Sequence, residues 1–160
     1  PNKRIDLAVK AFNKLKLPLK IAGRGQDEAY CRSIADENIE FHGTLSNKKL
    51  LELYQQARAL VFPGEDDFGI TPLEAQACNT PVIAYASGGA LETVTNQTGI
   101  FFYEQKEDAL CDAVQEMEQS WKNFSPERFS NQTKLFRREN YRERMADTIQ
   151  NGYKTWQRKK

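Results

Sequence analysis

The chain has 160 residues, of which 39% are hydrophobic and 28% are charged, and its formal net charge at pH 7 is +1. This length is enough for one domain with a substantial core, and the composition excludes the fibrous and disordered classes of protein. No apolar run approaches the roughly 20 residues of a membrane-spanning helix. Three widely spaced cysteines without a C-x-x-C pair, together with the lack of a signal-peptide pattern, favour a cytoplasmic protein.

The charge is distributed unevenly along the chain. Residues 1–120 contain 12 lysines and arginines against 18 aspartates and glutamates, whereas residues 121–160 contain 11 against 4. A basic C-terminal segment is typical of a surface that contacts an acidic domain, an anionic membrane or nucleic acid. It is equally typical of a solvated helix face, so the charge alone leaves these alternatives open.

In chain order, the pattern begins with a helix. Apolar residues recur with helical period over residues 5–15, and short β-branched or aromatic runs follow at 17–23 and 38–43. A doubly wound domain normally opens with a strand, so we expect a first strand upstream of residue 1. Further strands are expected at 59–63, 81–85 and 99–103, and further helices at 46–57, 71–78, 106–121 and 138–156.

The alternation of strands and helices predicts the architecture. The middle strands are nearly continuous apolar runs, which indicates right-handed βαβ units and a parallel sheet covered on both faces. The predicted fold class is therefore α/β, with a Rossmann-like, doubly wound parallel sheet followed by C-terminal helices. We expect residues 1–120 to form the sheet domain and residues 121–160 to form the basic helices.

The stretch GEDDFGITPLEAQAC, which begins at Gly64, follows one of the predicted strands. Thr71 followed by Pro72 is typical of a helix start, with Thr71 as the N-cap and Pro72 at the first helical position. Glu74 is then placed to complete a capping box with Thr71. This structural role is one interpretation of Glu74.

The position of the same loop also indicates a binding site. It lies at the carboxyl end of a parallel strand, where open α/β sheets bind ligands, and the N–H groups of a helix N-terminus favour phosphate. Carboxylates such as those of Asp66 and Glu74 favour sugar hydroxyls instead, because each accepts charge-assisted hydrogen bonds. Phosphate beside sugar hydroxyls describes a nucleotide sugar.

The stretch DDFGITPLEAQACNTPVIAY, followed by SGGALETV, resembles the donor-binding half of the retaining glycosyltransferases of family 4, which have the two-domain GT-B fold. The hallmark of this family is Glu-x7-Glu, and the matching positions here are Asp66 and Glu74. Asp66 therefore departs from the family pattern by one methylene. Asn79 stands where the family has a glycine before Thr-Pro-Val, and asparagine also tolerates a left-handed backbone at a helix end.

Other blocks resemble the family in the same order, and together they cover about residues 2–120. KRIDLAVKAF resembles the segment whose lysine contacts the donor diphosphate, which corresponds to Lys3. The turn that begins at Gly23 resembles the family's G-x-G-P turn. His42 and Gly43 lie where backbone groups of the family contact the nucleobase.

The resemblance implies roles for particular residues. Lys3 would stabilise the departing diphosphate, Asp66 would orient the sugar and Glu74 would hold the nucleotide ribose. The expected donor-binding residues as a whole are Lys3, Gly23, His42, Gly43, Asp66, Phe68, Gly69, Ile70, Thr71 and Glu74. His42 is the only histidine, which excludes a histidine-rich metal site, and we expect neither a metal nor a cofactor.

The motifs are most similar to those of mannosyltransferase-like members that build surface polysaccharides. The implied function is transfer of mannose from GDP-mannose to a glycan or lipid-linked acceptor, which would be held by an N-terminal domain outside this sequence. This chain alone is then expected to bind donor with little turnover. A UDP-sugar-dependent enzyme and a non-catalytic sugar-nucleotide-binding domain remain alternatives, whereas the lack of G-x-G-x-x-G disfavours a dehydrogenase.

The basic helix at the end of the chain has two candidate partners. The last helix of GT-B enzymes commonly crosses back onto the N-terminal domain, and we expect the same here. The alternative is peripheral contact with an anionic membrane at its inner face, close to a lipid-linked acceptor. Nucleic acid is disfavoured because residues 1–120 are acidic and carry no recognition motif.

Overall fold

Parallel strands form the centre of the protein, in a computed structural model that describes residues 2–158. β1 (Leu19–Ala22) pairs with β2 (Ile39–Gly43), and β4 (Val82–Tyr85) lies between β3 (Leu60–Phe62) and β5 (Gly99–Phe102). Each of these pairings is parallel. Every strand falls within a range predicted from the sequence, and the predicted α/β class is confirmed.

The strands form two sheets. Within residues 2–158, β1 is not paired with β3, so a two-stranded sheet and a three-stranded sheet lie in the same domain. The additional strand expected upstream of residue 1 concerns residues outside this chain, and it stays a prediction.

Helices connect the strands and continue beyond them. Their bounds are α1 (Ile5–Leu15), α2 (Glu28–Ile34), α3 (Asn47–Gln56), α4 (Ile70–Ala77), α5 (Ala90–Thr93), α6 (Glu107–Ser120), α7 (Pro126–Lys134) and α8 (Arg138–Gln157), with a 3₁₀ turn at Trp121–Asn123. The sequence pattern does not predict α2, because this helix has only 7 residues and buries only Cys31. In residues 2–158 no helix combines the length and apolar character needed to cross a membrane.

Helices pack on both faces of the three-stranded sheet, whereas Lys20 of β1 and Glu40 of β2 are exposed on one face of the two-stranded sheet. Neighbouring residues of a strand point to opposite faces, and β4 shows the consequence. Ile83 packs in a core cluster with residues of α1 and α6, whereas Val82 and Ala84 pack in a second cluster with Tyr54 of α3 and Ala75 of α4. Because β4 is buried on both faces, its sequence is a continuous apolar run.

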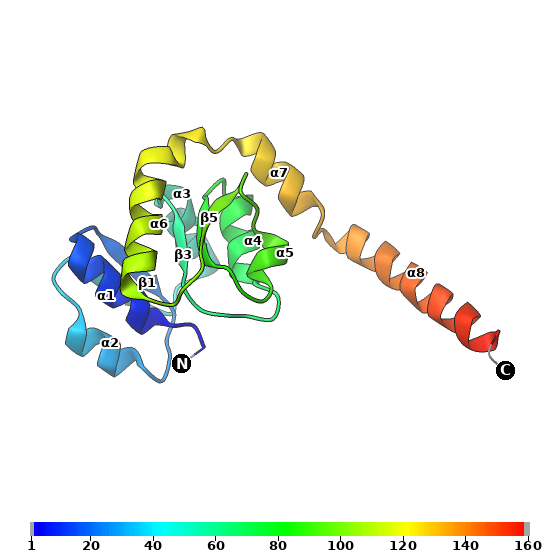
Figure 1. Cartoon of the computed structure of the whole chain (residues 1–160), viewed down its shortest axis with the longest axis horizontal. Coiled ribbons are helices and arrows are strands. Elements are labelled where there is room, and N and C mark those ends of the chain that lie inside the picture. Colours follow the sequence, from blue (N-terminus) through cyan, green and yellow to red (C-terminus); the bar gives the residue numbers. More distant parts are fainter. Residues whose placement is uncertain (1, 159–160) are drawn as a thin grey trace.

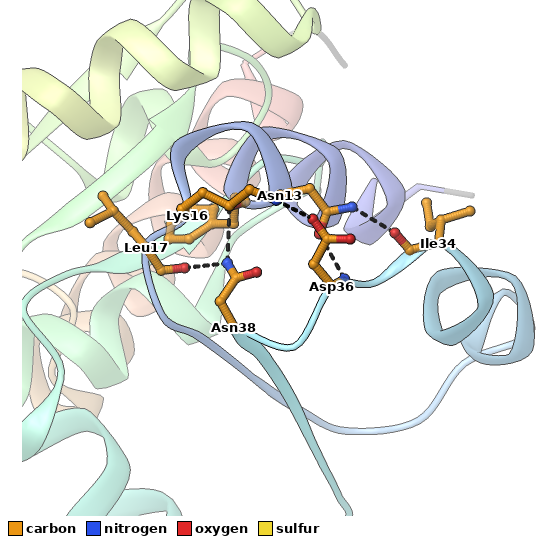
Figure 2. Close-up of polar contacts among 7 residues, drawn as sticks. Asn13, Lys16, Leu17, Ile34, Asp36 and Asn38 are labelled. Atoms are coloured by element: carbon orange, nitrogen blue, oxygen red, sulfur yellow. Dashed lines mark hydrogen bonds and ion pairs between the residues drawn. The ribbon is translucent and has the colours of Figure 1, made fainter.

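A polar network fixes the end of α1 against the segment that leads into β2 (Figure 2). Asn13 Nδ2 donates to the carbonyl oxygen of Ile34 at 2.6 Å, and Asn13 Oδ1 accepts from the N–H of Asp36 at 3.0 Å. Asn38 Nδ2 donates to the carbonyl oxygen of Leu17 at 2.6 Å. These bonds satisfy backbone groups at chain turns, and they hold the starts of β1 and β2 together.

The two C-terminal helices differ in their contacts. α7 packs on α4 and buries Phe129, and Gln132 Nε2 donates to the carbonyl oxygens of Glu92 and Thr93. α8 projects away from the rest of the protein (Figure 1), and none of its residues is buried. Its apolar side chains, from Tyr141 to Trp156, lie exposed. Docking of α8 on a neighbouring domain stays a prediction.

This difference predicts how truncation affects stability. Removal of residues 138–160 is expected to leave the free energy of unfolding within about 1 kcal/mol of its original value, because it exposes no core. Removal of residues 126–160 is expected to lower it by about 3–5 kcal/mol, because the buried Phe129 is lost. Urea unfolding followed by circular dichroism measures both. Equal losses for the two truncations would contradict the different roles of α7 and α8.

Candidate functional site

The loop between β3 and α4, residues 63–69, packs closely against the N-terminal segment. The N–H of Glu65 donates to the carbonyl oxygen of Asn2 at 3.2 Å. A Cβ atom at Gly64 would overlap this same carbonyl oxygen and the Cα atom of Lys3. Only glycine permits this approach, which brings the Lys3 side chain to the carboxyl end of β3.

The other side of the loop packs against the turn that follows β4. The N–H of Gly89 donates to the carbonyl oxygen of Asp66 at 2.8 Å. A Cβ atom at Gly89 would overlap the backbone of Phe68, and one at Gly88, where φ is +56°, would lie 2.5 Å from the carbonyl oxygen of Asp66. In the sequence this Gly-Gly pair is equally compatible with a turn and with phosphate binding. In the structure, the N–H of Gly89 is engaged in holding the loop.

Lys3 and Asp66 form an ion pair in this clamped loop. Lys3 Nζ donates to Asp66 Oδ2, and this hydrogen bond is the largest cause that lowers the pKa of the Asp66 carboxyl. The Lys3 ammonium also lies 5.4 Å from the centroid of the Phe62 ring. The two paired side chains are 57% and 35% exposed, so a ligand can reach both from solvent.

α4 begins two residues earlier than the predicted cap places it, and the predicted capping box is wrong. Gly69 is the N-cap, with φ of 81°, and Ile70 is the first helical residue. Thr71 therefore lies inside the first turn. Because glycine has no side chain and can adopt a left-handed backbone, it turns the chain into the helix without a side-chain acceptor. No side chain caps this end of α4 within the described residues, so its N–H groups face the loop.

Glu74 has a different partner. Its Oε2 atom accepts a hydrogen bond from the hydroxyl of Tyr54, at 3.2 Å. Glu74 is exposed, whereas Tyr54 of α3 is only 8% exposed. Burial, followed by the charge of Glu74, raises the pKa of Tyr54. The sequence pattern does not indicate this partner, because Tyr54 fits the apolar stripe of its helix and lies 20 positions away.

The remaining predicted residues lie at the ends of β1 and β2. The N–H of Gly23 donates to the carbonyl oxygen of Gly43 at 2.7 Å, and both glycines have positive φ, at +108° and +61°. Ala22 is paired with Gly43, which leaves His42 as an extra residue in β2. Such bulges re-aim side chains and are common beside binding sites. His42 Nε2 lies 3.1 Å from a carboxylate oxygen of Glu40.

Phe68 connects the acidic loop to the C-terminal helices. Its side chain is 44% exposed, and its ring lies edge-on to that of Phe136 with the centroids 5.7 Å apart. A groove of about 690 Å³ lies between α4 and α7, and its lining includes Ile70, Glu74 and Phe136. The loop is thus supported on three sides while its charged side chains stay accessible.

The predicted residues therefore form two groups, one at the carboxyl end of β3 and one at the carboxyl ends of β1 and β2. Lys3, Asp66 and the start of α4 form the first group, and Gly23, His42 and Gly43 form the second. A cation and free helix N–H groups suit phosphate oxygens, and nearby carboxylates suit hydroxyls. Within residues 2–158, no cluster of three or more His, Cys, Asp or Glu side chains could hold a metal ion.

Comparison with known sequences identifies the family. Residues 1–136 match the family described as glycosyl transferases group 1. The chain belongs to this family. Its structural neighbours are GT-B glycosyltransferases, in agreement with the α/β fold described above.

Individual relatives give the extent of the similarity. The chain is 32% identical over 133 residues to a GDP-mannose-dependent monoacylated alpha-(1-6)-phosphatidylinositol monomannoside mannosyltransferase from Corynebacterium glutamicum, covering 73% of this chain and 35% of that enzyme. The structure of sucrose-phosphate synthase from Thermosynechococcus elongatus superposes with a TM-score of 0.76 and 26% identity, over 96% of this chain and 43% of that one. The Anabaena HepE complex with UDP-glucose superposes with a TM-score of 0.79 at 15% identity, over 94% and 46%. The chain thus spans about a third of the length of its curated relative.

The close approach at Gly89 predicts the effect of a single methyl group. Gly89→Ala is expected to lower the free energy of unfolding by about 1–3 kcal/mol, because the new Cβ overlaps the Phe68 backbone. Gly152→Ala is the matched control, since no neighbouring atom lies within 4 Å of its Cβ position, and it is expected to be neutral or slightly stabilising. Urea unfolding measures both variants. A neutral Gly89→Ala would contradict the clamp.

The raised pKa of Tyr54 predicts a loss of stability at alkaline pH. Its ordinary value is 10.0, so above this pH the unfolded chain loses a proton that the folded protein keeps. The free energy of unfolding is unaffected by this group below pH 10 and falls above it, by up to about 1.4 kcal/mol per pH unit. Tyr54→Phe should show a shallower decline in urea unfolding between about pH 9 and pH 11. Identical declines in the two proteins would contradict the expected shift.

Proposed function

We propose that this chain is the donor-binding domain of a retaining hexosyltransferase that transfers mannose from GDP-mannose to a glycan or lipid-linked acceptor in polysaccharide synthesis. The observation that carries the proposal is the clamped loop after β3, in which Lys3 is paired with Asp66 beside the N-terminus of α4. Family membership supports the reaction class.

In this proposal the protein acts by positioning and by electrostatic stabilisation. The bond between the anomeric carbon and the donor phosphate breaks, and a bond to the oxygen of an acceptor hydroxyl forms with retained configuration, while the hydroxyl proton passes to the departing diphosphate. Lys3 and the N–H groups at the start of α4 stabilise the charge that develops on the leaving diphosphate. Asp66, released from Lys3 as the diphosphate binds, orients the sugar hydroxyls. Glu74 holds the nucleotide ribose.

The second group of residues is proposed to receive the nucleobase. Gly23, His42 and Gly43 meet at a bulge on the same edge of the sheets, where exposed backbone groups can contact a planar ring. Phe68, Gly69, Ile70 and Thr71 complete the proposed donor site, with the amides of Gly69 and Ile70 as phosphate ligands. No metal or cofactor takes part in this proposal.

Two observations bear on the identity of the donor. The bacterial relative that is 32% identical carries GDP-mannose in its name, which favours the same donor here. The UDP-glucose complex of HepE is only 15% identical and supports the fold alone, so a UDP-sugar is the second candidate. The chain spans 35% of this relative. In the proposal, the acceptor site lies on another domain. The proposal also includes a cytoplasmic location and contact with the inner face of the membrane.

Calorimetric titration of the intact protein with GDP, GDP-mannose, UDP and UDP-glucose tests the proposal. GDP and GDP-mannose are expected to bind more tightly than the uridine pair. Glu74→Ala is expected to weaken binding about 10- to 100-fold, because charge-assisted hydrogen bonds to the ribose are lost. Glu52→Ala removes an exposed carboxylate from the neighbouring helix α3 and should leave binding unchanged.

The possible outcomes separate the alternatives. Preference for UDP would keep the reaction class and overturn the mannose assignment. Donor binding without any transfer to acceptors by the intact protein would favour a non-catalytic sugar-nucleotide-binding domain. If a folded intact protein binds none of the four ligands, the proposed function is wrong.

A further inference from the structure

We propose that Tyr54 is a positioning residue for Glu74: its hydroxyl holds one carboxylate oxygen so that the other faces the ribose hydroxyls of the nucleotide donor. This inference rests on the proposed function and extends it to a residue of α3, outside the acidic loop and the helix that follows it. The contact that carries it is the 3.2 Å hydrogen bond between the Tyr54 hydroxyl and Glu74 Oε2.

Glu74 does not cap the helix to which it belongs. The start of α4 is formed by Gly69, and no side chain in residues 2–158 caps it, so the carboxylate of Glu74 is not needed to begin the helix. Glu74 is exposed, and an exposed glutamate side chain normally samples several rotamers. A hydrogen bond from another helix selects among these rotamers at a site where a ligand is expected.

Tyr54 is held in place by the core. Its ring belongs to the buried cluster that contains Phe62, Ala75 and Val82. Its carbonyl oxygen accepts a hydrogen bond from Thr80 Oγ1 at 2.7 Å, and Thr80 is only 2% exposed. Both the backbone and the ring are therefore fixed by the core, so the hydroxyl is a donor at a fixed place.

The hydrogen bond from Tyr54 leaves one oxygen of the Glu74 carboxylate for a ligand. A carboxylate has two oxygens, and Tyr54 occupies Oε2. Oε1 then remains as an acceptor, and adjacent ribose hydroxyls are donors that suit it. With the carboxylate already oriented, the ligand does not bear the entropy of ordering this side chain, and affinity is higher for that reason.

The experiment compares GDP with 2′,3′-dideoxy-GDP, which lacks both ribose hydroxyls, as ligands of the intact protein; the uridine pair serves if UDP binds more tightly. Tyr54→Phe is expected to weaken GDP binding about threefold to tenfold and to leave the affinity for the dideoxy nucleotide unchanged. In the Glu74→Ala background, Tyr54→Phe should have no further effect on GDP binding. Tyr30→Phe, which removes a hydroxyl from a half-exposed tyrosine of α2, is the matched control and should change neither affinity.

Other results would overturn the inference in distinguishable ways. Equal weakening of both nucleotides by Tyr54→Phe would assign Tyr54 a general structural role. Loss of ribose discrimination in Glu74→Ala but not in Tyr54→Phe would mean that Glu74 binds ribose unaided, and the proposed function would stand. If the unmodified protein binds neither nucleotide, the proposed function fails together with the role of Tyr54. The near-ultraviolet circular dichroism of each variant confirms that its core is intact.

Discussion

Contact between backbones at glycine positions is the constraint on which the candidate site depends. Gly64 lies against Asn2 and Lys3, and Gly89 lies against the backbone of Phe68, with no room for a side chain at either place. The loop after β3 is consequently fixed by segments before α1 and after β4. Charged side chains on such a loop have defined positions without being buried, so they escape the large desolvation cost of a buried charge.

The Lys3–Asp66 pair illustrates what this arrangement allows. A surface ion pair contributes little stability, since both groups are solvated and the side chains lose entropy on pairing. The pair is therefore easily opened by a ligand that offers an anion to Lys3 and hydroxyls to Asp66. The backbone contacts of the loop keep the two residues next to each other, so an anion and hydroxyl groups of one ligand can be bound at adjacent positions.

The sequence predicts the strands and the longer helices because their apolar periodicity is local information. Residues 81–85 form a short apolar run with β-branched residues, residues 106–121 have apolar residues at helical period, and β4 and α6 form there. α2 is too short to show a stripe. The sequence predicts the start of α4 at the wrong residue, because Thr71 and Pro72 form a local cap signal while Gly69, two residues before Thr71, adopts the left-handed backbone that begins the helix. Lys3 and Asp66 were predicted for one site through family resemblance, but their direct pairing depends on packing that no local pattern records.

Tyr54 shows why the rest of the site could not be predicted. By pattern it is a core residue of an amphipathic helix, and its ring is buried accordingly. Only tertiary structure places its hydroxyl against Glu74: the Tyr54 ring lies in one buried cluster with Ala75 of α4, and Thr80, which follows α4, donates to the Tyr54 carbonyl oxygen. A tyrosine can satisfy the core with its ring and a site with its hydroxyl at once, because it is apolar along its length and polar at its tip. The core on this face of the sheet is therefore connected directly to the candidate site. A change in the packing of Tyr54 would alter the position of the Glu74 carboxylate through a single hydrogen bond.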